Sequence, residues 1–155
     1  MSYSNEIVEA VKTFFNEDDW HYEFDEENGI FSGGINIKSK LASVNFFLRV
    51  KEEDLINSTQ IQIKAEESVR NNVGEYLTRV NYGLIFGCFE MDYQDGEIQY
   101  RMSASLAELQ ADCKKTMCVL LGLPCKMFER YGDGLLAVMF GMETPEEALA
   151  NVRKK

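Results

Sequence analysis

Acidic side chains are the residues of this chain whose spacing comes closest to a catalytic pattern. Two groups of three carboxylates, at positions 17–19 and 25–27, flank a short segment that alternates like a β-strand. Paired carboxyls act as general acid and base when an apolar pocket raises the pKa of one of them. Nothing in the sequence isolates one carboxyl in this way. We therefore interpret both groups as a solvated acidic rim and keep an enzyme with an unrecognised carboxylate site as an alternative.

Other catalytic and metal-binding patterns are missing from the sequence. His21 is the only histidine, so neither a catalytic triad nor a histidine-rich metal site can be assembled. The acids around Asp95 do not follow the EF-hand order, and turn chemistry explains Asp95 without a metal. The Gly33-Gly34 pair lacks the spacing of a nucleotide-binding loop. We predict no catalytic residue, no cofactor and no metal, and hence a protein that is not an enzyme.

The four cysteines, at positions 88, 113, 118 and 125, show no CxxC spacing. The zinc-site pattern is therefore absent. Cys113 and Cys118 fall in an apolar helical pattern, where a free thiol behaves as a small hydrophobic side chain. We expect them to pack in the core in reduced form, because disulfides are rare in the cytoplasm.

Length, composition and charge limit the class of protein. The 155 residues, 45% of them hydrophobic, fit a single domain over residues 1–155 with a substantial core. The formal net charge of -10 would repel a nucleic-acid backbone or an anionic membrane surface. No apolar run approaches the roughly 20 residues of a membrane span, and the N-terminal segment lacks the pattern of a signal peptide. We expect a cytoplasmic protein that binds neither nucleic acid nor membrane.

Hydrophobic periodicity predicts an α+β fold, a bent antiparallel sheet packed with helices in the order α-β-β-β-(β)-α-β-β-α-α-α. Ser4 is the expected N-cap of a first helix whose apolar stripe ends at Phe15. Period-two alternation predicts strands, and 3.6-residue periodicity predicts the later helices. The predicted strands are 20–24, 30–37, 44–50, 60–65 after a polar connection at 51–58, and the hairpin strands 89–93 and 98–102. The predicted later helices are 67–85, 105–122, 124–140 and 144–152.

Two features of the predicted strands bear on packing and binding. The Gly33-Gly34 pair predicts either a bulge or the close approach of another backbone. Phe47 falls on the outward side of the strand at 44–50, whose inward side is uniformly apolar. An outward aromatic side chain indicates that the second face of the sheet is not wholly solvated.

The segment from Val69 to Met102 combines an amphipathic helix with a hairpin. Asn81 borders the apolar stripe of the helix, and we expect its side chain to hydrogen-bond a neighbouring backbone group rather than a ligand. A two-residue turn at Asp95-Gly96 would set Glu90 opposite Arg101. Such an ion pair contributes about 0.2–1 kcal/mol when exposed.

Four runs of the second half stand out together: Arg79 to Gly83, Gly87 to Asp92, Asp95 to Arg101, and Phe140 to Leu149. In this order they resemble the YbjN family, which is described as bacterial sensory transduction regulators. The resemblance covers residues 69–149, whereas the first half matches only in the order of its elements. It implies the fold of type III secretion chaperones, in which helices pack on a strongly bent antiparallel sheet. It implies no reaction, because the family offers no catalytic residues to carry over.

The leading hypothesis is a non-enzymatic binding or regulatory protein of the chaperone type. Its acidic surface and an apolar groove of the sheet would receive a partner protein segment or a second copy of the chain. A homodimer is expected, because an apolar second face needs cover. A dedicated type III secretion-type chaperone is the alternative. The residues that motivate binding are Phe47 and the aromatics Tyr76, Tyr82 and Phe86; the candidate partner-binding or structural residues are Phe47, Asn81, Glu90 and Arg101.

Overall fold

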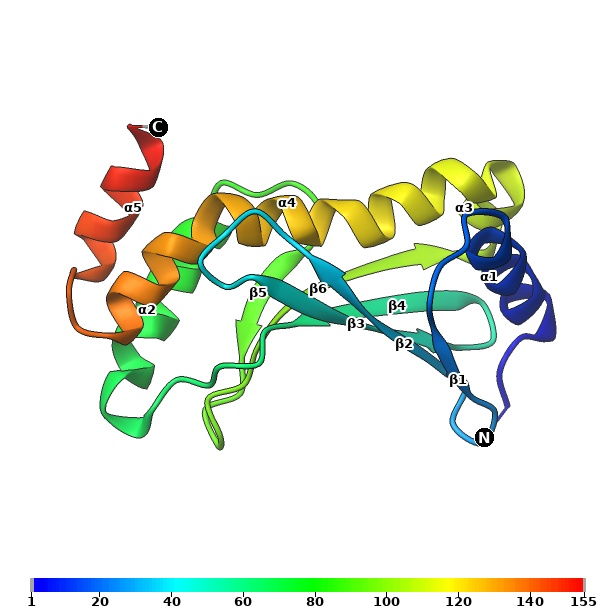
Figure 1. Ribbon diagram of the computed structural model, residues 1–155, viewed down its shortest axis with the longest axis horizontal. Helices are drawn as coiled ribbons and strands as arrows, with labels where there is room; N and C mark the ends of the chain where they lie inside the picture. The colour runs from blue at the N-terminus through cyan, green and yellow to red at the C-terminus, as the bar shows by residue number, and fades with distance from the viewer. Residues whose placement is uncertain (1, 155) are drawn as a thin grey trace.

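Six antiparallel strands form one sheet in the order β1-β2-β3-β4-β6-β5 (Figure 1). The structure is a computed structural model that describes residues 2–154. The strands are β1 (Glu23–Asp25), β2 (Ile30–Asn36), β3 (Ser43–Val50), β4 (Asp54–Gln60), β5 (Cys88–Met91) and β6 (Ile98–Ser105). The helices are α1 (Asn5–Glu17), α2 (Arg70–Asn81), α3 (Leu106–Ala111), α4 (Cys113–Met139) and α5 (Pro145–Arg153), with a 3-10 turn η1 (Glu67–Val69) before α2.

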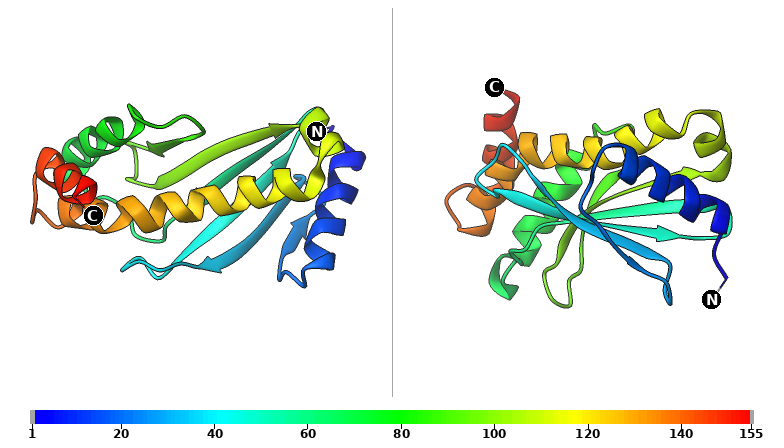
Figure 2. Two further views of the ribbon diagram at one scale, coloured as in Figure 1. Left: turned by 90° about the horizontal axis from the view of Figure 1, so that it is seen from above. Right: turned by 45° about the vertical axis from the view of Figure 1, so that its right-hand side comes forward.

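The helices lie on one side of the sheet. Helix α4 runs along the sheet, with α1 and α3 at one end of the molecule and α2 and α5 at the other (Figures 1 and 2). The sheet twists strongly across its width (Figure 2). The predicted α+β fold and the predicted order of elements are therefore confirmed. Within residues 2–154, none of the helices combines the length and the hydropathy that a membrane span requires.

Alternation along the strands decides which face of the sheet is buried. In β3 every second side chain from Val44 to Val50 is buried, and β6 repeats this from Ile98 to Ala104. These side chains pack under the helices. The opposite side chains form what we call the uncovered face: Ile30, Ser32, Gly34, Asn45, Phe47, Arg49, Ile56, Ser58, Gln60, Cys88, Glu90, Gln99, Arg101 and Ser103.

An aromatic cluster fastens α1 to the sheet. The ring of Phe15 lies 5.9 Å from that of Phe31 and 5.6 Å from that of Phe46, measured between centroids. The predicted N-cap Ser4 is confirmed, since its Oγ accepts the N–H of Ile7. Two capping boxes start later helices, one at Ser105 with Glu108 and one at Thr144 with Glu147.

The fourth strand is β4 at Asp54–Gln60, so the predicted strand at 60–65 and the predicted polar connection at 51–58 were wrong. The buried side chains of β4 are Leu55, Asn57 and Thr59, and two of these three are polar. The period-two hydrophobic signal disappears when polar residues face the core. The fourth strand was therefore predicted too late in the chain, at residues 60–65, where apolar and polar residues next alternate.

A buried amide explains the polar inward side of β4. The Asn57 side chain is fully buried, and its Nδ2 donates to the backbone oxygen of Leu120 at 2.8 Å and to Thr59 Oγ1 at 3.1 Å. In a regular helix the oxygen of Leu120 would accept the N–H of residue 124. Residue 124 is a proline inside α4 and has no N–H. Asn57 therefore supplies, from the sheet, the hydrogen bond that the helix lacks.

Helix α4 continues through Pro124, so the predicted helix boundary between 122 and 124 was wrong. The helical stripe that starts at Leu106 is interrupted earlier, at Asp112, whose φ of -160° and ψ of 90° separate α3 from α4. The Asp112 carboxylate accepts the N–H of Lys115 at 3.0 Å and thereby caps α4. The sequence predicted a helix boundary at Pro124 because the donor that replaces its missing N–H, the amide of Asn57, comes from a distant strand.

The first strand and the central helix are shorter than predicted. Strand β1 covers Glu23–Asp25 rather than 20–24, because the Trp20 ring packs 5.4 Å from that of Phe15 and the backbone N–H of Trp20 donates to the backbone oxygen of Phe15. Helix α2 ends at Asn81 rather than near residue 85. Residues 82–87 instead form a loop, which we call the apolar loop. It ends at Gly87, whose φ of 71° favours glycine.

The β5–β6 hairpin has a longer loop than predicted. Met91 pairs with Ile98 and Glu90 with Gln99, so the predicted pairing of Glu90 with Arg101 was wrong by two residues. The carboxylates of Asp92 and Asp95 each accept a backbone N–H two residues further on. These two successive turns occupy residues 92–97, so the loop is longer than the predicted two-residue turn.

The glycine pair of β2 accommodates a close approach and not a bulge. The register between β2 and β3 is continuous through Gly33 and Gly34. A Cβ on Gly33 would lie 2.6 Å from the Phe46 ring and 2.9 Å from the backbone oxygen of His21. The prediction that another backbone comes close at this pair is confirmed.

The link between Asn57 and α4 can be tested by a double-mutant cycle. N57L leaves the buried Leu120 oxygen without a donor, so we expect it to lower the free energy of unfolding by about 1–3 kcal/mol. P124A restores the helical N–H. We therefore expect N57L to cost about 1 kcal/mol less in the P124A background than in the wild type. Urea unfolding followed by circular dichroism measures all four proteins.

Ser58→Ala, on the uncovered face of the same strand, is the matched control and should change stability by less than about 0.5 kcal/mol. Equal costs of N57L in the two backgrounds would show that Asn57 does not substitute for the missing helical donor.

Candidate functional site

Phe47 lies in the middle of the uncovered face. Its partners in the sheet are Ser32 on β2 and Ser58 on β4, both with short polar side chains. The Phe47 side chain is 36% exposed, whereas the inward phenylalanine next to it, Phe46, is fully buried. Arg49, two residues along β3, lies between Ile30 and Ile56. The centre of this face thus offers an aromatic ring, aliphatic side chains and hydrogen-bonding groups to a partner.

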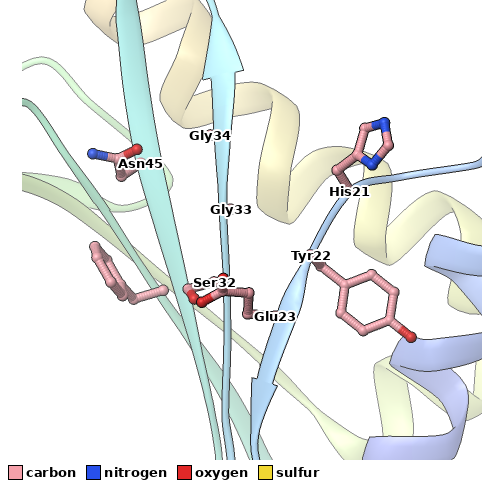
Figure 3. A pocket seen from close by; sticks show the side chains of 8 residues that line it. His21, Tyr22, Glu23, Ser32, Gly33, Gly34 and Asn45 are labelled. Carbon is pink, nitrogen blue, oxygen red and sulfur yellow. The ribbon is translucent and has the colours of Figure 1, made fainter.

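A hollow of about 510 Å³ lies beside Phe47, where β1 separates from β2 (Figure 3). It is lined by His21, Tyr22, Glu23, Ser32, Gly33, Gly34, Asn45 and Phe47. The Tyr22 ring stacks on Phe15 at 4.8 Å and so turns toward the helices, as Figure 3 also shows. The groups that remain can donate and accept hydrogen bonds and make apolar contact. The lining includes the Ser32 hydroxyl and the His21 imidazole, but within residues 2–154 no hydrogen bond joins Ser32 to His21 or to Glu23.

A second hollow, of about 360 Å³, lies between the sheet and the apolar loop. Its lining includes Ile56, Met102 and Arg101 from the sheet and Ile85 and Phe86 from the loop. In the apolar loop, the exposed fractions are 95% for Tyr82, 87% for Ile85 and 67% for Phe86. Three large apolar side chains within five residues are thus exposed, which makes the apolar loop a candidate contact surface.

Glu90 and Arg101 form the predicted ion pair despite the altered register. Arg101 Nε lies 2.5 Å from Glu90 Oε1, and both side chains are partly exposed on the uncovered face. The pair survives because a shift of two residues keeps a side chain on the same face of the sheet, whereas a shift of one would move it to the other. Glu90 lies opposite Gln99 and Arg101 lies opposite Cys88, so the ion pair runs diagonally between two neighbouring pairs of the ladder.

Asn81 binds the backbone of the edge strand. Its Nδ2 donates to the oxygen of Phe89 and its Oδ1 accepts the N–H of Phe89, both at 2.8 Å. Bonded and non-bonded pairs alternate along the β5–β6 ladder, and the pair Asp92–Glu97 is bonded. Phe89 therefore belongs to a non-bonded pair, and its backbone N–H and C=O point away from β6. Asn81 therefore satisfies the outer edge of the sheet at Phe89, which is the structural role expected from the sequence. A role of these residues in partner binding stays a prediction.

The acidic groups near β1 do not form an enclosed site. All six carboxylates at positions 17–19 and 25–27 are exposed. Asp25 is occupied by a turn: its carboxylate accepts the backbone N–H groups of Glu27 and Asn28 and the amide of Asn28. The hydrogen bonds from Asn28 lower the pKa of Asp25, the opposite of what a general acid requires.

Three further sequence-based expectations are settled by burial. Tyr76 was expected among the spare aromatics, but it is fully buried and donates to the backbone oxygen of Tyr131 at 2.8 Å. Cys118 was expected in the core, but it is exposed, and Cys113 is only half-buried. His21 is exposed. No group of three or more His, Cys, Asp or Glu side chains within residues 2–154 is arranged to hold a metal ion.

Arg49 and Ile85 were not predicted as binding residues. The alternation that turns Phe47 outward also places Arg49 on the outward side of the strand, where a charged residue is ordinary and gives no signal of binding. Ile85 was assigned to the central helix, because the apolar stripe continues through Leu84. Only the hydrogen bonds between the Asn81 side chain and Phe89 of β5 show that the helix ends before Ile85.

Comparisons with known proteins identify a family. The family model described as "YbjN: Putative bacterial sensory transduction regulator" matches residues 8–131. A chain in the crystal structure of the ExsC-ExsE complex superposes with a TM-score of 0.46 and 15% sequence identity, over 84% of this chain and 96% of that chain. Comparison with curated proteins finds no significant match.

Asn81 should matter more for stability than the ion pair beside it. We expect N81A to lower the free energy of unfolding by about 1–3 kcal/mol, because two edge groups of Phe89 lose their partners. E90Q removes an exposed ion pair and should cost less than about 1 kcal/mol. Urea unfolding of both variants makes the comparison. If N81A costs no more than E90Q, water satisfies the edge of β5 equally well.

Proposed function

We propose that this chain, which belongs to the YbjN family, is a non-enzymatic regulatory protein that binds a partner protein on the uncovered face of its sheet. The observation that carries the proposal is the position of Phe47, an exposed aromatic ring in the centre of a face that the helices leave free. Aromatic side chains at the centre of a contact surface commonly dominate binding energy.

The surroundings of Phe47 resemble a binding surface in composition. Serine and amide side chains at Ser32, Ser58 and Asn45 surround the ring and can hydrogen-bond to a partner. Arg49 brings a cation close to Phe47, and arginine is enriched in protein interfaces. Within residues 2–154 no carboxylate lies within ion-pair distance of Arg49. Its guanidinium is therefore free to pair with a partner.

The side chains near Phe47 favour binding over catalysis. The hollow beside Phe47 contains one imidazole, His21, and one carboxylate, Glu23, and both are exposed. Catalytic acids and bases usually have shifted pKa values produced by burial or by a close charge. Exposed groups of this kind supply recognition more readily than proton transfer. A dedicated secretion chaperone would use the same face, with its partner being a secreted protein.

A charge introduced at Phe47 tests the proposal. F47D should abolish capture of the partner from cells that express this protein naturally, because a carboxylate would have to be desolvated at the centre of the contact. V119D is the matched control: Val119 is 45% exposed and lies on α4, which packs against the other face. Affinity capture with quantitative mass spectrometry compares the two variants with the wild type. If F47D retains the proteins that V119D retains, the uncovered face is not the binding surface.

We further propose that the protein forms a homodimer through the apolar loop. A two-fold interface brings the same surface patch of both copies together, so a protruding side chain needs a hollow next to it. Ile85 protrudes, and the hollow lined by Ile56 and Met102 lies beside it. In a symmetric pair, the Ile85 of each copy would enter the hollow of the other.

Multi-angle light scattering tests self-association. We expect the wild type to have the mass of a dimer and I85D that of a monomer, because the carboxylate would be buried without a partner. M142D introduces the same charge at an exposed apolar residue far along the chain and should remain dimeric. A wild type that stays monomeric at high concentration would contradict this proposal.

A further inference from the structure

We propose that the free edge of β2, at Gly34 and Asn36, takes an added β-strand from an extended segment of the partner, with a large apolar side chain of that segment over Gly34. The inference rests on the proposed function and specifies its chemistry: main-chain hydrogen bonds at the sheet edge, combined with contact to Phe47. A partner strand added to an exposed edge is an established form of peptide recognition.

The hydrogen-bond pattern shows which groups of β2 face outward. Val50 donates to the oxygen of Gly29, and Ile37 donates to the oxygen of Ala42. Bonded and non-bonded pairs alternate along an antiparallel ladder, so the odd-numbered residues of β2 bond β3. The N–H and C=O groups of Gly34 and Asn36 therefore point to the opposite side, toward the line of β1.

Strand β1 stops before it can satisfy these groups. Its last pair with β2 is Glu23 with Ser32, and in the same register His21 would pair with Gly34. The chain instead leaves the sheet at His21, whose oxygen approaches the helix side of Gly33. Figure 3 shows the ribbon turning away there while β2 continues past Gly34. Within residues 2–154, Gly34 and Asn36 have no hydrogen-bond partner on this side.

The opposite edge of the sheet is protected at Phe89. Asn81 already occupies the outward N–H and C=O of Phe89 in β5. A strand added there would have to displace two hydrogen bonds of 2.8 Å. Proteins commonly cover or charge their edge strands in this way to prevent unwanted pairing. The segment of β2 beyond β1 lacks such cover, and this contrast assigns the added strand to β2.

The side-chain requirement follows from the glycine. Gly34 lies on the uncovered face, and a Cβ there would meet Asn45 Oδ1 at 3.5 Å and the Val44 oxygen at 3.9 Å, both ordinary contact distances, so the hollow extends over it. A residue paired with Gly34 would project to the same face. An aromatic or long aliphatic side chain would fill the hollow, reach Phe47 and cover the glycine backbone.

Charge selects one end of the segment. Glu23 lines the hollow, and Asp25 follows on the same side of β1; both are exposed. A segment that continues the line of β1 would end beside Glu23. The occupant is therefore an extended partner segment that places a large apolar residue opposite Gly34 and a basic residue at the end next to Glu23. The net charge of -10 of this protein also favours a basic segment.

A phage library of unconstrained random decapeptides is the probe, selected on the full-length protein. We expect enriched sequences to combine alternating apolar residues with a basic end. One enriched peptide, synthesised with a fluorophore, should bind the wild type and protect the amides of Gly34 and Asn36 in hydrogen exchange. Failure to enrich any peptide, or protection confined to other surfaces, overturns the proposal. Amides of Gly34 and Asn36 that are already protected by self-association would show that the occupant is a second copy, which also overturns it.

Proline and alanine at residue 34 separate the main-chain contact from simple bulk. G34P removes the outward N–H without breaking a bond to β3, and proline is tolerated at such edge positions. We expect the peptide Kd measured by fluorescence anisotropy to rise at least about tenfold in G34P. G34A keeps the N–H and adds one methyl group, so its Kd should rise less than about threefold. Equal binding to G34P and to the wild type overturns the proposal.

Two further variants keep the test decisive if G34P does not fold or if the proposed function itself is wrong. If G34P unfolds, N36P removes the other outward N–H of the same edge and takes its place. F47D in the partner-capture experiment reports on the proposed function alone. Loss of partner capture in F47D with unchanged peptide binding in G34P would leave the uncovered face as the binding surface and refute strand addition. Unchanged capture in F47D refutes the proposed function itself.

Discussion

The hydrogen bond from Asn57 to the oxygen of Leu120 is the contact on which the arrangement of this protein depends. It joins the middle of the sheet to the longest helix at the turn where Pro124 leaves a carbonyl free. A buried carbonyl without a donor is costly, so sheet and helix stabilise one another only in this relative position. Further along α4, Glu129 and Asp133 accept the backbone N–H groups of Lys38 and Lys40, which ties the β2–β3 turn to the same helix. The helices are thereby committed to one face, and the other face stays free.

Much of the fold could be predicted because local signals and tertiary packing agree. The capped helix starts at Ser4, Ser105 and Thr144 depend on residues three positions apart, and the alternation in β3 reflects a fully apolar inward side. Three of the errors share one cause. At Asn57, Pro124 and Asn81 a polar group is satisfied by a partner that lies far away in sequence or in another element. Periodicity does not register such partners, so β4, α4 and the end of α2 were misplaced.

The candidate site was only partly visible in the sequence for a related reason. Phe47 could be identified, since an aromatic residue on the polar side of a strand is itself a signal. The Glu90–Arg101 pair could be identified because an error of two residues in register preserves the face. Ile85 and the hollow beside it could not, because they appear only once the helix is known to end at Asn81. The face on which Phe47, Glu90 and Arg101 lie could be predicted, whereas the end of the central helix could not.

The open edge of β2 follows from the packing of the core rather than from any binding motif. Trp20 must reach Phe15 and Phe46 on the helix side of the sheet, at ring distances of 5.4 and 6.0 Å. The chain can take this route only by crossing close to β2 at Gly33, where a side chain would collide with the His21 oxygen. Strand β1 then starts too late to pair with Gly34 and Asn36. Within residues 2–154, the aromatic core that stabilises the first helix therefore also leaves the outward backbone groups of Gly34 and Asn36 unpaired near Phe47. Recognition by main-chain groups needs no catalytic side chain, which is consistent with a chain whose sequence shows a clear fold and no active-site pattern.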